Sequence, residues 1–386
     1  MISSKYEVIT FSSDSKEGLK EKENKIYEEL IGEKSLKDCN LIKELQETKL
    51  SGLYKSGTVI KQESDKLNIS KFKDNTKDNI TNNTADKKVV FMFGGQGTQY
   101  KNMCKNLYDT IPFYKRVVEE CLIHIESEEI NSQVKEYLIG DKDDVKESAT
   151  IIVQLAIFIT EYAMAQLLIY CNIIPYALIG YSLGEYVAAV VSGTYLLEDT
   201  IKILIKRGEL INKSPKGKMI SVPLNALELQ TILPEDVYLA IDNGVSCVVS
   251  GELSAIDAFE KKLSTLRIMC YPIESSHPLH SSILNSVKEE FVEYLSLINF
   301  NSPEIPMVSN VTGKWLDKET ISTKKYWSEH LCATVQFDSV LKNISEIENV
   351  VFLEIGANRA ISMLLFRYIC CSLIRSAYIR DILPDV

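Results

Sequence analysis

The sequence predicts an α/β protein whose main domain has a large α/β subdomain interrupted by a ferredoxin-like subdomain, with a small α/β module in front. Two short apolar runs, Val89–Phe93 and Ala177–Ile179, are typical of buried parallel strands. A later segment of the chain shows the order β-α-β-β-α-β, which is the ferredoxin-like arrangement. The predicted parts are the module at 1–86, the large subdomain at 87–217 and 277–386, and the inserted subdomain at 218–276.

The first module is predicted from short periodic segments. Tyr6–Phe11 alternates like a strand, and Ser15–Ile31 places its apolar residues at helical spacing. Leu36–Leu50 is predicted to be a second helix and Gly57–Lys61 a short strand. The following segment, Lys71–Lys88, is almost entirely Lys, Asp, Asn and Thr, so it is predicted to be a solvated linker.

Composition narrows the classes of function. A formal net charge of −10 over 386 residues gives no electrostatic support for a nucleic-acid partner. Nine scattered cysteines without a C-x-x-C pair, and no signal peptide at the start, indicate reduced thiols and a cytoplasmic location. The glycosylation sequon at Asn310 then carries no weight. The apolar stretch Ile151–Ile174 contains Gln154 and Glu161, so we expect a buried helix and no membrane span.

The main domain opens with the strand Val89–Phe93, which runs into the glycine-rich loop Gly94–Gln99. Such a loop could cradle a phosphate, but its spacing is neither G-x-G-x-x-G nor G-x-x-x-x-G-K-S/T. The alternative is that the glycines let the backbone approach a reacting group, with Gln96 offering an amide donor. Helices are expected around Cys104–Asn106 and over Pro112–Glu126.

The segment with the most specific signal is Gly180-Tyr-Ser-Leu-Gly184, a G-x-S-x-G pattern between the strand Ala177–Ile179 and a helix. This strand–turn–helix predicts an α/β-hydrolase-like large subdomain, with Ser182 held in a strained turn as a nucleophile. The N–H of Leu183 would then point at a developing oxyanion. The alternative is an ordinary turn whose serine caps the helix.

The next helix, predicted over Leu196–Ile211, carries Arg207. An arginine on a helix is most often solvated, but apolar neighbours make partial burial plausible here. A buried guanidinium needs a carboxylate, and a substrate could supply it.

The inserted subdomain has its own pattern. Its elements are predicted as strand Met219–Pro223, helix Ala226–Leu233, strand Val237–Ile241, strand Ser246–Ser250, helix Leu253–Leu266 and strand Arg267–Ile273. An insertion with its own core makes a cleft against its host, and such clefts bind ligands. The tail returns to α/β character with strands Pro306–Ser309 and Val350–Glu354 and helices Ser339–Ile347 and Ala360–Cys370.

A serine nucleophile needs a base within hydrogen-bond reach, usually a histidine. The chain has four: His124, His277, His280 and His330. His124 and His330 fall on predicted helices, whereas His277 and His280 lie on the loop that returns the chain from the inserted subdomain. The base is therefore expected at His277 or His280, and periodicity does not choose between them.

These motifs together resemble the malonyl-CoA:acyl carrier protein transacylase family, most closely the acyltransferase domains of modular polyketide synthases. The resemblance covers roughly residues 88–372. It is carried by Gly94-Gly-Gln-Gly-Thr-Gln, Gly180-Tyr-Ser-Leu-Gly-Glu, Arg207-Gly, Ala240-Ile-Asp-Asn-Gly, Val249-Ser-Gly, His277-Pro-Leu-His-Ser, Tyr326-Trp-Ser-Glu-His-Leu and Phe352-Leu-Glu-Ile-Gly. The first 86 residues are similar to the linker that joins ketosynthase to acyltransferase in such synthases, which implies a piece of a larger synthase.

The resemblance implies a role for each matching position. Ser182 would become acylated, and His280, in the family's H-x-x-H-S pattern, would be the base. Gln96 and the Leu183 N–H would form the oxyanion hole. Arg207 would hold the free carboxylate of a malonyl-type group.

The implied mechanism is ping-pong transfer. Ser182 would take the acyl group from acyl-CoA, and the phosphopantetheine thiol of an acyl carrier protein would then remove it. A backbone carbonyl near His330 would orient His280. A neighbouring ketosynthase is the other expected partner, and no bound cofactor or metal is needed.

Selectivity is expected to depend on residues that flank Ser182. The family usually has His where this chain has Tyr181, and usually Phe where it has Leu279. Asn243, in the Ala240-Ile-Asp-Asn-Gly motif, is expected at the same pocket. The identity of Leu183 and the spacing of His277 from His280 resemble malonyl-selecting domains, so malonyl-CoA is the expected donor, with methylmalonyl or an unusual extender as the alternative.

Three other functions remain open from the sequence. An acyl hydrolase of the same fold would keep the serine and histidine but would have no use for Arg207. A general esterase would place an acidic residue between Ser and His in chain order and would lack the inserted subdomain. A catalytically silent docking platform is compatible with Tyr181.

Overall fold

The computed structural model describes residues 5–31, 41, 45, 54–63, 66–69, 87–140 and 150–368 of the chain. Two compact units are present, residues 1–86 and 87–386. Nearly all of the predicted helix Leu36–Leu50, and the part of the predicted linker before residue 87, lie outside the described residues.

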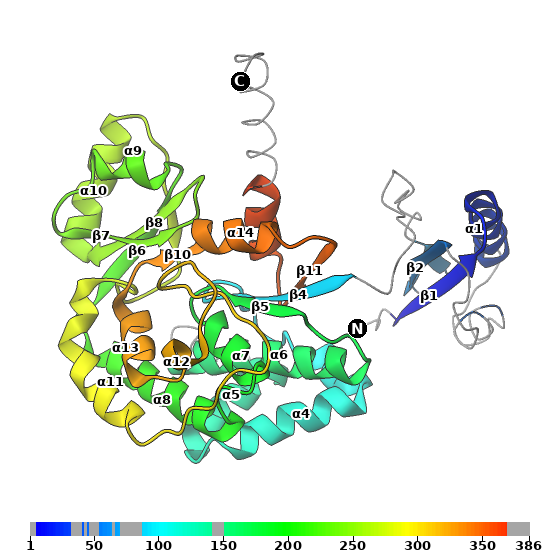
Figure 1. Cartoon of the computed structure of the whole chain (residues 1–386), viewed down its shortest axis with the longest axis horizontal. Helices are drawn as coiled ribbons and strands as arrows, with labels where there is room; N and C mark the ends of the chain where they lie inside the picture. The colour runs from blue at the N-terminus through cyan, green and yellow to red at the C-terminus, as the bar shows by residue number, and fades with distance from the viewer. Residues whose placement is uncertain are drawn as a thin grey trace. The chain divides into compact units, whose positions relative to one another are not determined.

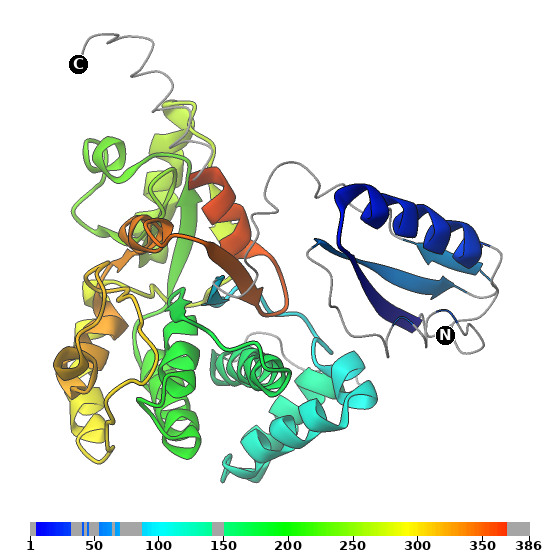
Figure 2. The ribbon, with the colours of Figure 1, turned by 45° about the vertical axis from the view of Figure 1, so that its right-hand side comes forward.

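The first unit is a three-stranded antiparallel sheet with a helix packed on it (Figure 2). The strand β1 (Lys5–Ser13) pairs with β2 (Tyr54–Glu63), which pairs with β3 (Lys66–Ile69). The helix α1 (Lys16–Ile31) follows β1 directly. Its apolar positions meet those of the sheet in a small core of Ile9, Phe11, Leu19, Ile26, Leu30 and Ile60.

The large subdomain is organised on a parallel sheet in the order β11-β4-β5 (Figure 1). The central strand β4 (Lys88–Phe93) is buried over its last four residues, as an apolar strand of a parallel sheet requires. It lies between β11 (Val350–Ile355) and β5 (Ala177–Gly180). The predicted strand Pro306–Ser309 forms only isolated bridges, one between Met307 and Leu178 of β5 and one between Val308 and Trp315.

Helices surround this sheet. They are α3 (Lys105–Thr110), α4 (Pro112–Ile123), α5 (Glu128–Ile139), α6 (Thr150–Tyr170), α7 (Gly184–Val191), α8 (Leu197–Lys213), the 3-10 helix η2 (Ser282–Val287), α11 (Lys288–Leu295), α12 (Lys318–Ile321), α13 (Lys324–Cys332), α14 (Phe337–Ser345) and a helical segment over 360–368. The helix α6 has the length and composition of a membrane span, yet 67% of its most apolar window is buried inside the protein. It packs against α4, α5, α7 and α8, which is the behaviour of a core helix.

The inserted subdomain has the predicted ferredoxin-like topology and a core of its own. Its elements are β6 (Gly217–Val222), α9 (Ala226–Gln230), β7 (Val237–Asp242), β8 (Cys247–Glu252), α10 (Leu253–Thr265) and β9 (Tyr271–Ile273). The antiparallel strands lie in the order β7-β8-β6-β9, and the short strand β10 (Val335–Gln336) from the large subdomain extends the sheet in parallel with β7. This pairing connects the two subdomains.

The predicted boundaries are wrong at two places in this subdomain. The strand expected from Arg267 begins only at Tyr271, because α10 ends in a turn with Arg267 at a φ of 60°. The helix expected to reach Leu233 ends at Gln230, and Thr231 caps it. In the large subdomain, α5 was not predicted from the sequence, although Ser127 caps its first turn as the sequence allows.

Candidate active site

The turn after β5 holds Ser182 in a left-handed backbone conformation, with a φ of 54°. A Cβ at Gly180 would lie 2.1 Å from the Glu185 nitrogen, and one at Gly184 would lie 2.2 Å from the Phe93 carbonyl oxygen. Neither position has room for a side chain. The strand, the turn and α7 can therefore pack this closely only with glycine on both sides of the serine.

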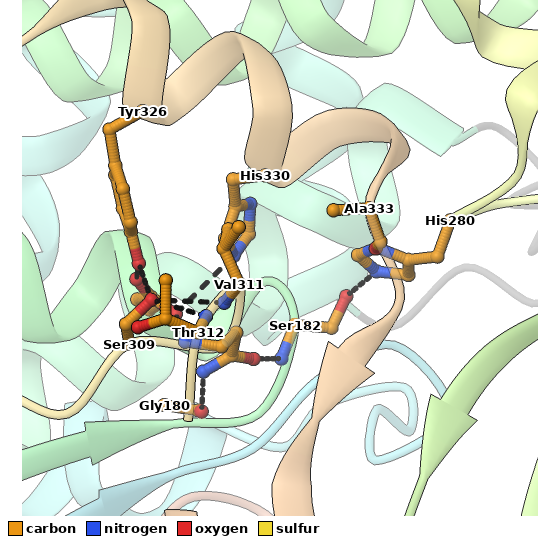
Figure 3. A network of polar contacts seen from close by, with 11 residues as sticks. Gly180, Ser182, His280, Ser309, Val311, Thr312, Tyr326, His330 and Ala333 are labelled. Atoms are coloured by element: carbon orange, nitrogen blue, oxygen red, sulfur yellow. Dashed lines mark hydrogen bonds and ion pairs between the residues drawn. The ribbon is translucent and has the colours of Figure 1, made fainter. Parts of the chain in front are cut away.

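Ser182 faces His280 (Figure 3). The serine Oγ lies 2.6 Å from Nε2 of the imidazole, and Nδ1 lies 3.1 Å from the carbonyl oxygen of Ala333. A carbonyl only accepts, so Nδ1 carries the proton and Nε2 presents its lone pair to the hydroxyl. His280 itself has a φ of 55°, which turns the loop so that its ring reaches the serine.

The surroundings of His280 favour its neutral form. Burial lowers the pKa of His280 well below 6.5, and the nearby His330 and Arg207 lower it further. The hydrogen bond to the Ala333 carbonyl acts in the opposite direction. At neutral pH the imidazole is therefore unprotonated and can accept the serine proton.

A buried asparagine, Asn310, braces the nucleophile turn through its side-chain amide. The Oδ1 atom of Asn310 accepts from the Ser182 N–H at 2.7 Å, and its Nδ2 donates to the Gly180 carbonyl at 2.7 Å. Its own backbone N–H donates to Oε2 of Glu185 at 2.8 Å. Asn310 is 1% exposed, so the sequon that contains it is not accessible.

Glu185 links this brace to α13. Its Oε1 accepts a hydrogen bond from the Tyr326 hydroxyl, which lies 2.8 Å from Oγ of Ser309. Nε2 of His330 lies 3.5 Å from Oε2 of the same carboxylate. Tyr326 and His330 are both on α13, and α13 ends at the residue before Ala333.

The glycine-rich loop lies against the nucleophile turn. A Cβ at Gly95 would be 2.6 Å from the Tyr181 carbonyl oxygen, so glycine allows this approach. The Gly94 N–H donates to the buried carboxyl of Glu161 at 2.8 Å, and burial raises the pKa of Glu161 well above 4.5. The half-buried Gln96 lines the same cavity as Ser182. Leu183 immediately precedes the first residue of α7.

Arg207 is fully buried on α8, with 1% of its surface exposed. One Nη atom donates to Oε1 of Gln154 at 2.8 Å, and the guanidinium carbon lies 5.7 Å from the ring centre of Tyr186. The Nε atom of Arg207 and the Nε2 atom of Gln154 have no partner. Among the described residues no carboxylate lies within ion-pair distance of Arg207, and burial lowers the pKa of this guanidinium.

Ser182 and His280, which we call the dyad, line a cavity where the two subdomains meet. Its volume is about 60 Å³. Its walls are Gln96, Tyr181, Ser182, Met219, Ile241, Val248, Ile273, Glu274, Ser275, Leu279 and His280. Six wall residues have polar side chains, and the other five, Met219, Ile241, Val248, Ile273 and Leu279, are apolar. Strands of the inserted subdomain supply Met219, Ile241 and Val248.

Tyr181 stands on one wall of this cavity with its ring edge-on to Phe337, 4.7 Å between centres. Burial raises the pKa of Tyr181 to about 12, and a hydrogen bond from the Asn243 side chain opposes that rise. Oδ1 of Asn243 has no partner.

The structure brings most of the predicted site residues together. Ser182, His280, Gln96, Tyr181 and Leu279 line one cavity. Arg207 is close enough to His280 to lower its pKa.

The remaining candidates lie around or outside that cavity. Leu183 follows the cavity-lining Ser182 in the chain, and the side chain of Asn243 hydrogen-bonds to the cavity-lining Tyr181. His277 is buried, with Nδ1 3.0 Å from Ser276 Oγ, and burial lowers the pKa of His277 to about 4. The ring of His330 lies edge-on to that of His280, 6.0 Å between centres, and its Nε2 lies 3.5 Å from Oε2 of Glu185. The carbonyl expected near His330 is that of Ala333. His124 lines a different cavity, with Lys202 and Tyr294.

Four residues that hold the site had no role predicted from the sequence: Gln154, Glu185, Asn310 and Tyr326. Gln154 had a detectable signal, since it is an amide flanked by apolar residues on both sides in α6. Asn310 had none, because it lies 128 residues after the serine whose N–H it accepts.

Comparison with known proteins identifies the family. Residues 90–365 match the model of the acyl transferase domain. The chain belongs to this family. It is 30% identical over 277 residues to a phenolphthiocerol/phthiocerol polyketide synthase of Mycobacterium tuberculosis, covering 71% of this chain and 18% of that protein. It is 29% identical over 293 residues to the spectinabilin polyketide synthase system protein NorB of Streptomyces orinoci, covering 72% of this chain and 13% of that protein. The chain therefore spans less than a fifth of the length of these curated relatives.

Solved structures agree with this assignment. The acyl transferase domain of ZmaA superposes with a TM-score of 0.78 at 29% identity, over 94% of this chain and 85% of that one. MCAT from Streptococcus pneumoniae gives a TM-score of 0.63 at 28% identity, over 73% of this chain and 93% of that one. The α/β fold predicted from the sequence is confirmed, and the chain is an acyltransferase of the polyketide synthase type with a serine–histidine pair.

Proposed function

We propose that this acyltransferase moves a malonyl-type group from coenzyme A to the phosphopantetheine thiol of an acyl carrier protein through an ester on Ser182. The observation that carries the proposal is the buried charge of Arg207, which has no carboxylate partner among the described residues and lies close to the dyad. A buried cation of this kind is costly unless it is paired. The free carboxylate of a malonyl-type group would supply the pair, with Gln154 holding the guanidinium in place.

In the first half-reaction His280 acts as general base. Nε2 takes the proton of Ser182 Oγ while Oγ bonds to the thioester carbonyl carbon, and the carbonyl oxygen becomes an oxyanion. The Leu183 N–H at the start of α7 and the amide of Gln96 are the proposed donors to that oxyanion. The C–S bond then breaks, the proton passes from His280 to the departing CoA sulfur, and the acyl group remains on Ser182.

The second half-reaction reverses these steps with a different thiol. The phosphopantetheine thiol gives its proton to Nε2 of His280 and its sulfur bonds to the ester carbonyl. The bond between the acyl carbon and Oγ of Ser182 breaks, and the proton passes from His280 to Oγ. The Ala333 carbonyl accepts the Nδ1 hydrogen bond throughout, so it stabilises the imidazolium that forms in each half-reaction. This chemistry needs no bound cofactor or metal.

Malonyl is the donor we propose, because it is a small acyl group that carries a free carboxylate for Arg207. Leu279 and Tyr181 line the cavity beside Ser182 and His280 and would contact the acyl group. A single α-methyl branch changes binding by only about 1–3 kcal/mol in an apolar pocket, so methylmalonyl is the nearest competitor. Tyr181, Asn243, His277 and Leu279 are the proposed selectivity residues.

The wider context is proposed from the relatives. Both curated relatives named above are polyketide synthases, and this chain matches a small part of each. We propose that the unit over residues 1–86 is the linker to a neighbouring ketosynthase, and that the chain works in polyketide biosynthesis in the cytoplasm, with reduced thiols. Six described cysteines have free thiols.

Intact-protein mass spectrometry tests the proposal. The protein is mixed separately with malonyl-, methylmalonyl- and acetyl-CoA, in parallel with Ser182→Ala and Arg207→Ala. The expected result is a malonyl adduct that is absent from Ser182→Ala and, in Arg207→Ala, reduced for malonyl but not for acetyl. An acetyl adduct that forms faster than the malonyl adduct in the native protein would refute the role of Arg207.

A further inference from the structure

We infer that Asn310 is a positioning residue for the nucleophile, and that Glu185 and Tyr326 extend its action to the element that holds the base. The inference rests on the proposed function of Ser182 and His280. It goes beyond that function by assigning three residues that touch neither the acyl group nor the reacting atoms.

The turn that carries Ser182 is strained. Ser182 has a φ of 54°, a conformation that L-residues rarely adopt and that persists only where the surroundings fix it. Asn310 hydrogen-bonds to two backbone groups of this turn. Its Oδ1 accepts from the Ser182 N–H, and its Nδ2 donates to the Gly180 carbonyl. The two backbone partners fix the orientation of the amide, since an N–H only donates and a carbonyl only accepts.

Asn310 is itself held by Glu185. Its backbone N–H donates to Glu185, and Glu185 belongs to the first turn of α7, the helix that follows the nucleophile. The asparagine is therefore tied to both ends of the segment from Gly180 to Glu185. Asn310 and Glu185 are 1% and 0% exposed, so water does not compete for these hydrogen bonds.

Glu185 in turn connects to the element that holds the base. Oε1 of Glu185 accepts from Tyr326 on α13, and the residue after α13, Ala333, accepts the Nδ1 proton of His280. The contacts lead from the Ser182 N–H through Asn310 and Glu185 to α13. From Ala333, next to α13, they lead back through His280 to the Ser182 Oγ. The nucleophile turn and the base are thus both hydrogen-bonded to α13 or to the residue that follows it. These contacts fix the distance between Ser182 and His280.

The test measures the reactivity of Ser182 without any acyl donor. A fluorophosphonate that labels nucleophilic serines is the probe, and intact mass gives the second-order labelling constant of folded protein between pH 6 and 9. The variants are Asn310→Asp, which replaces the donor to Gly180 by an oxygen, and Tyr326→Phe, which removes only the hydroxyl. Asn343→Asp is the control, because Asn343 on α14 also donates to two carbonyls but stands outside this network.

The expected result is a labelling constant lower by roughly tenfold to a hundredfold in Asn310→Asp, as for a small misplacement of a reacting group. A smaller fall is expected in Tyr326→Phe, and a change of less than about twofold in Asn343→Asp. In Tyr326→Phe the labelling constant is expected to stay at a plateau from pH 6.5 to 9, as in the native protein, because the pKa of His280 lies well below 6.5 and this variant leaves the base untouched. Native labelling constants in folded Asn310→Asp and Tyr326→Phe would overturn the inference. If Asn310→Asp does not fold, Tyr326→Phe alone decides between the two outcomes.

The experiment separates this inference from the proposed function. Labelling of Ser182 needs no coenzyme A, so a protein that rejects malonyl-CoA but labels normally refutes only the donor assignment. Ser182→Ala gives the background of the label. Unfolding temperatures of all variants, measured in parallel, show whether a loss of labelling goes with loss of the fold.

Discussion

Replacing Gly184 by alanine tests whether the close packing behind the nucleophile is needed for catalysis. A Cβ there would lie 2.2 Å from the Phe93 carbonyl oxygen and 2.6 Å from that of Gly94, whereas real contacts stay beyond 3.0 Å. The atoms must therefore separate by about 0.8 Å. The Phe93 carbonyl cannot yield easily, because it accepts from the Tyr181 N–H at 2.9 Å and belongs to the central strand β4.

The start of α7 must then move, and Ser182 and Leu183 move with it. A displacement near 1 Å at reacting atoms can lower the rate by about a hundredfold. Overpacking of a close contact typically destabilises a fold by about 1–3 kcal/mol. We therefore expect Gly184→Ala to fold, with a modestly lower unfolding temperature, and to lose about a hundredfold in kcat/KM.

The assay is CoA release from malonyl-CoA in the presence of a carrier protein, with thermal unfolding measured on the same samples. Gly140→Ala is the control, because Gly140 has a φ of −80° and a Cβ there meets only the flexible end of Glu136. Native kcat/KM in a folded Gly184→Ala would refute the reasoning. An equal loss in Gly140→Ala would do the same.

Four further predictions concern the arginine, the base and the cavity. Gln154→Leu removes the acceptor that holds Arg207. The preference for malonyl over acetyl, measured as the ratio of the two adduct-formation rates, should therefore fall by roughly tenfold, while the acetyl rate stays unchanged. An unchanged ratio would contradict this. Because burial lowers the pKa of His280 well below 6.5, kcat/KM should stay at its plateau through pH 6.5 and fall only at more acidic pH, where the protonated imidazole cannot accept the serine proton; a midpoint above 6.5 would count against it. In His330→Gln one of the neighbouring groups that lower this pKa is gone, so the midpoint should move to higher pH. Leu279→Phe puts a larger side chain into a cavity of about 60 Å³, so methylmalonyl transfer should fall more than malonyl transfer. Competition between the two donors measures this. An equal fall would argue against Leu279 as a selectivity residue.

The nucleophile turn was predictable from the sequence because its determinants are local. Two glycines, one serine and an apolar run lie within eight residues of each other, and the structure places them as strand, turn and helix. The inserted subdomain was predictable for a similar reason. Its first three strands are short segments rich in apolar residues, and the order of elements fixes the topology.

The support of the site was not predictable, because it depends on contacts between distant segments. Asn310 follows a segment that forms only one bridge to β5, and nothing in its neighbours shows that its amide reaches Ser182. Periodicity could not choose between His277 and His280, and only the resemblance to the family favoured His280. Both are buried, and only the left-handed conformation of His280 turns its ring toward the serine.

The fate of the acylated Ser182 tests the proposed transfer most directly. Malonyl-enzyme is formed with a slight excess of malonyl-CoA, freed of CoA, and divided between buffer alone and buffer with a carrier protein bearing phosphopantetheine. Intact mass then follows both proteins. We expect that the adduct persists in buffer and passes within seconds to the carrier thiol, restoring the free serine. Decay at the same rate in both samples, with malonate released and no malonyl-carrier formed, would show a hydrolase and contradict the proposed transfer.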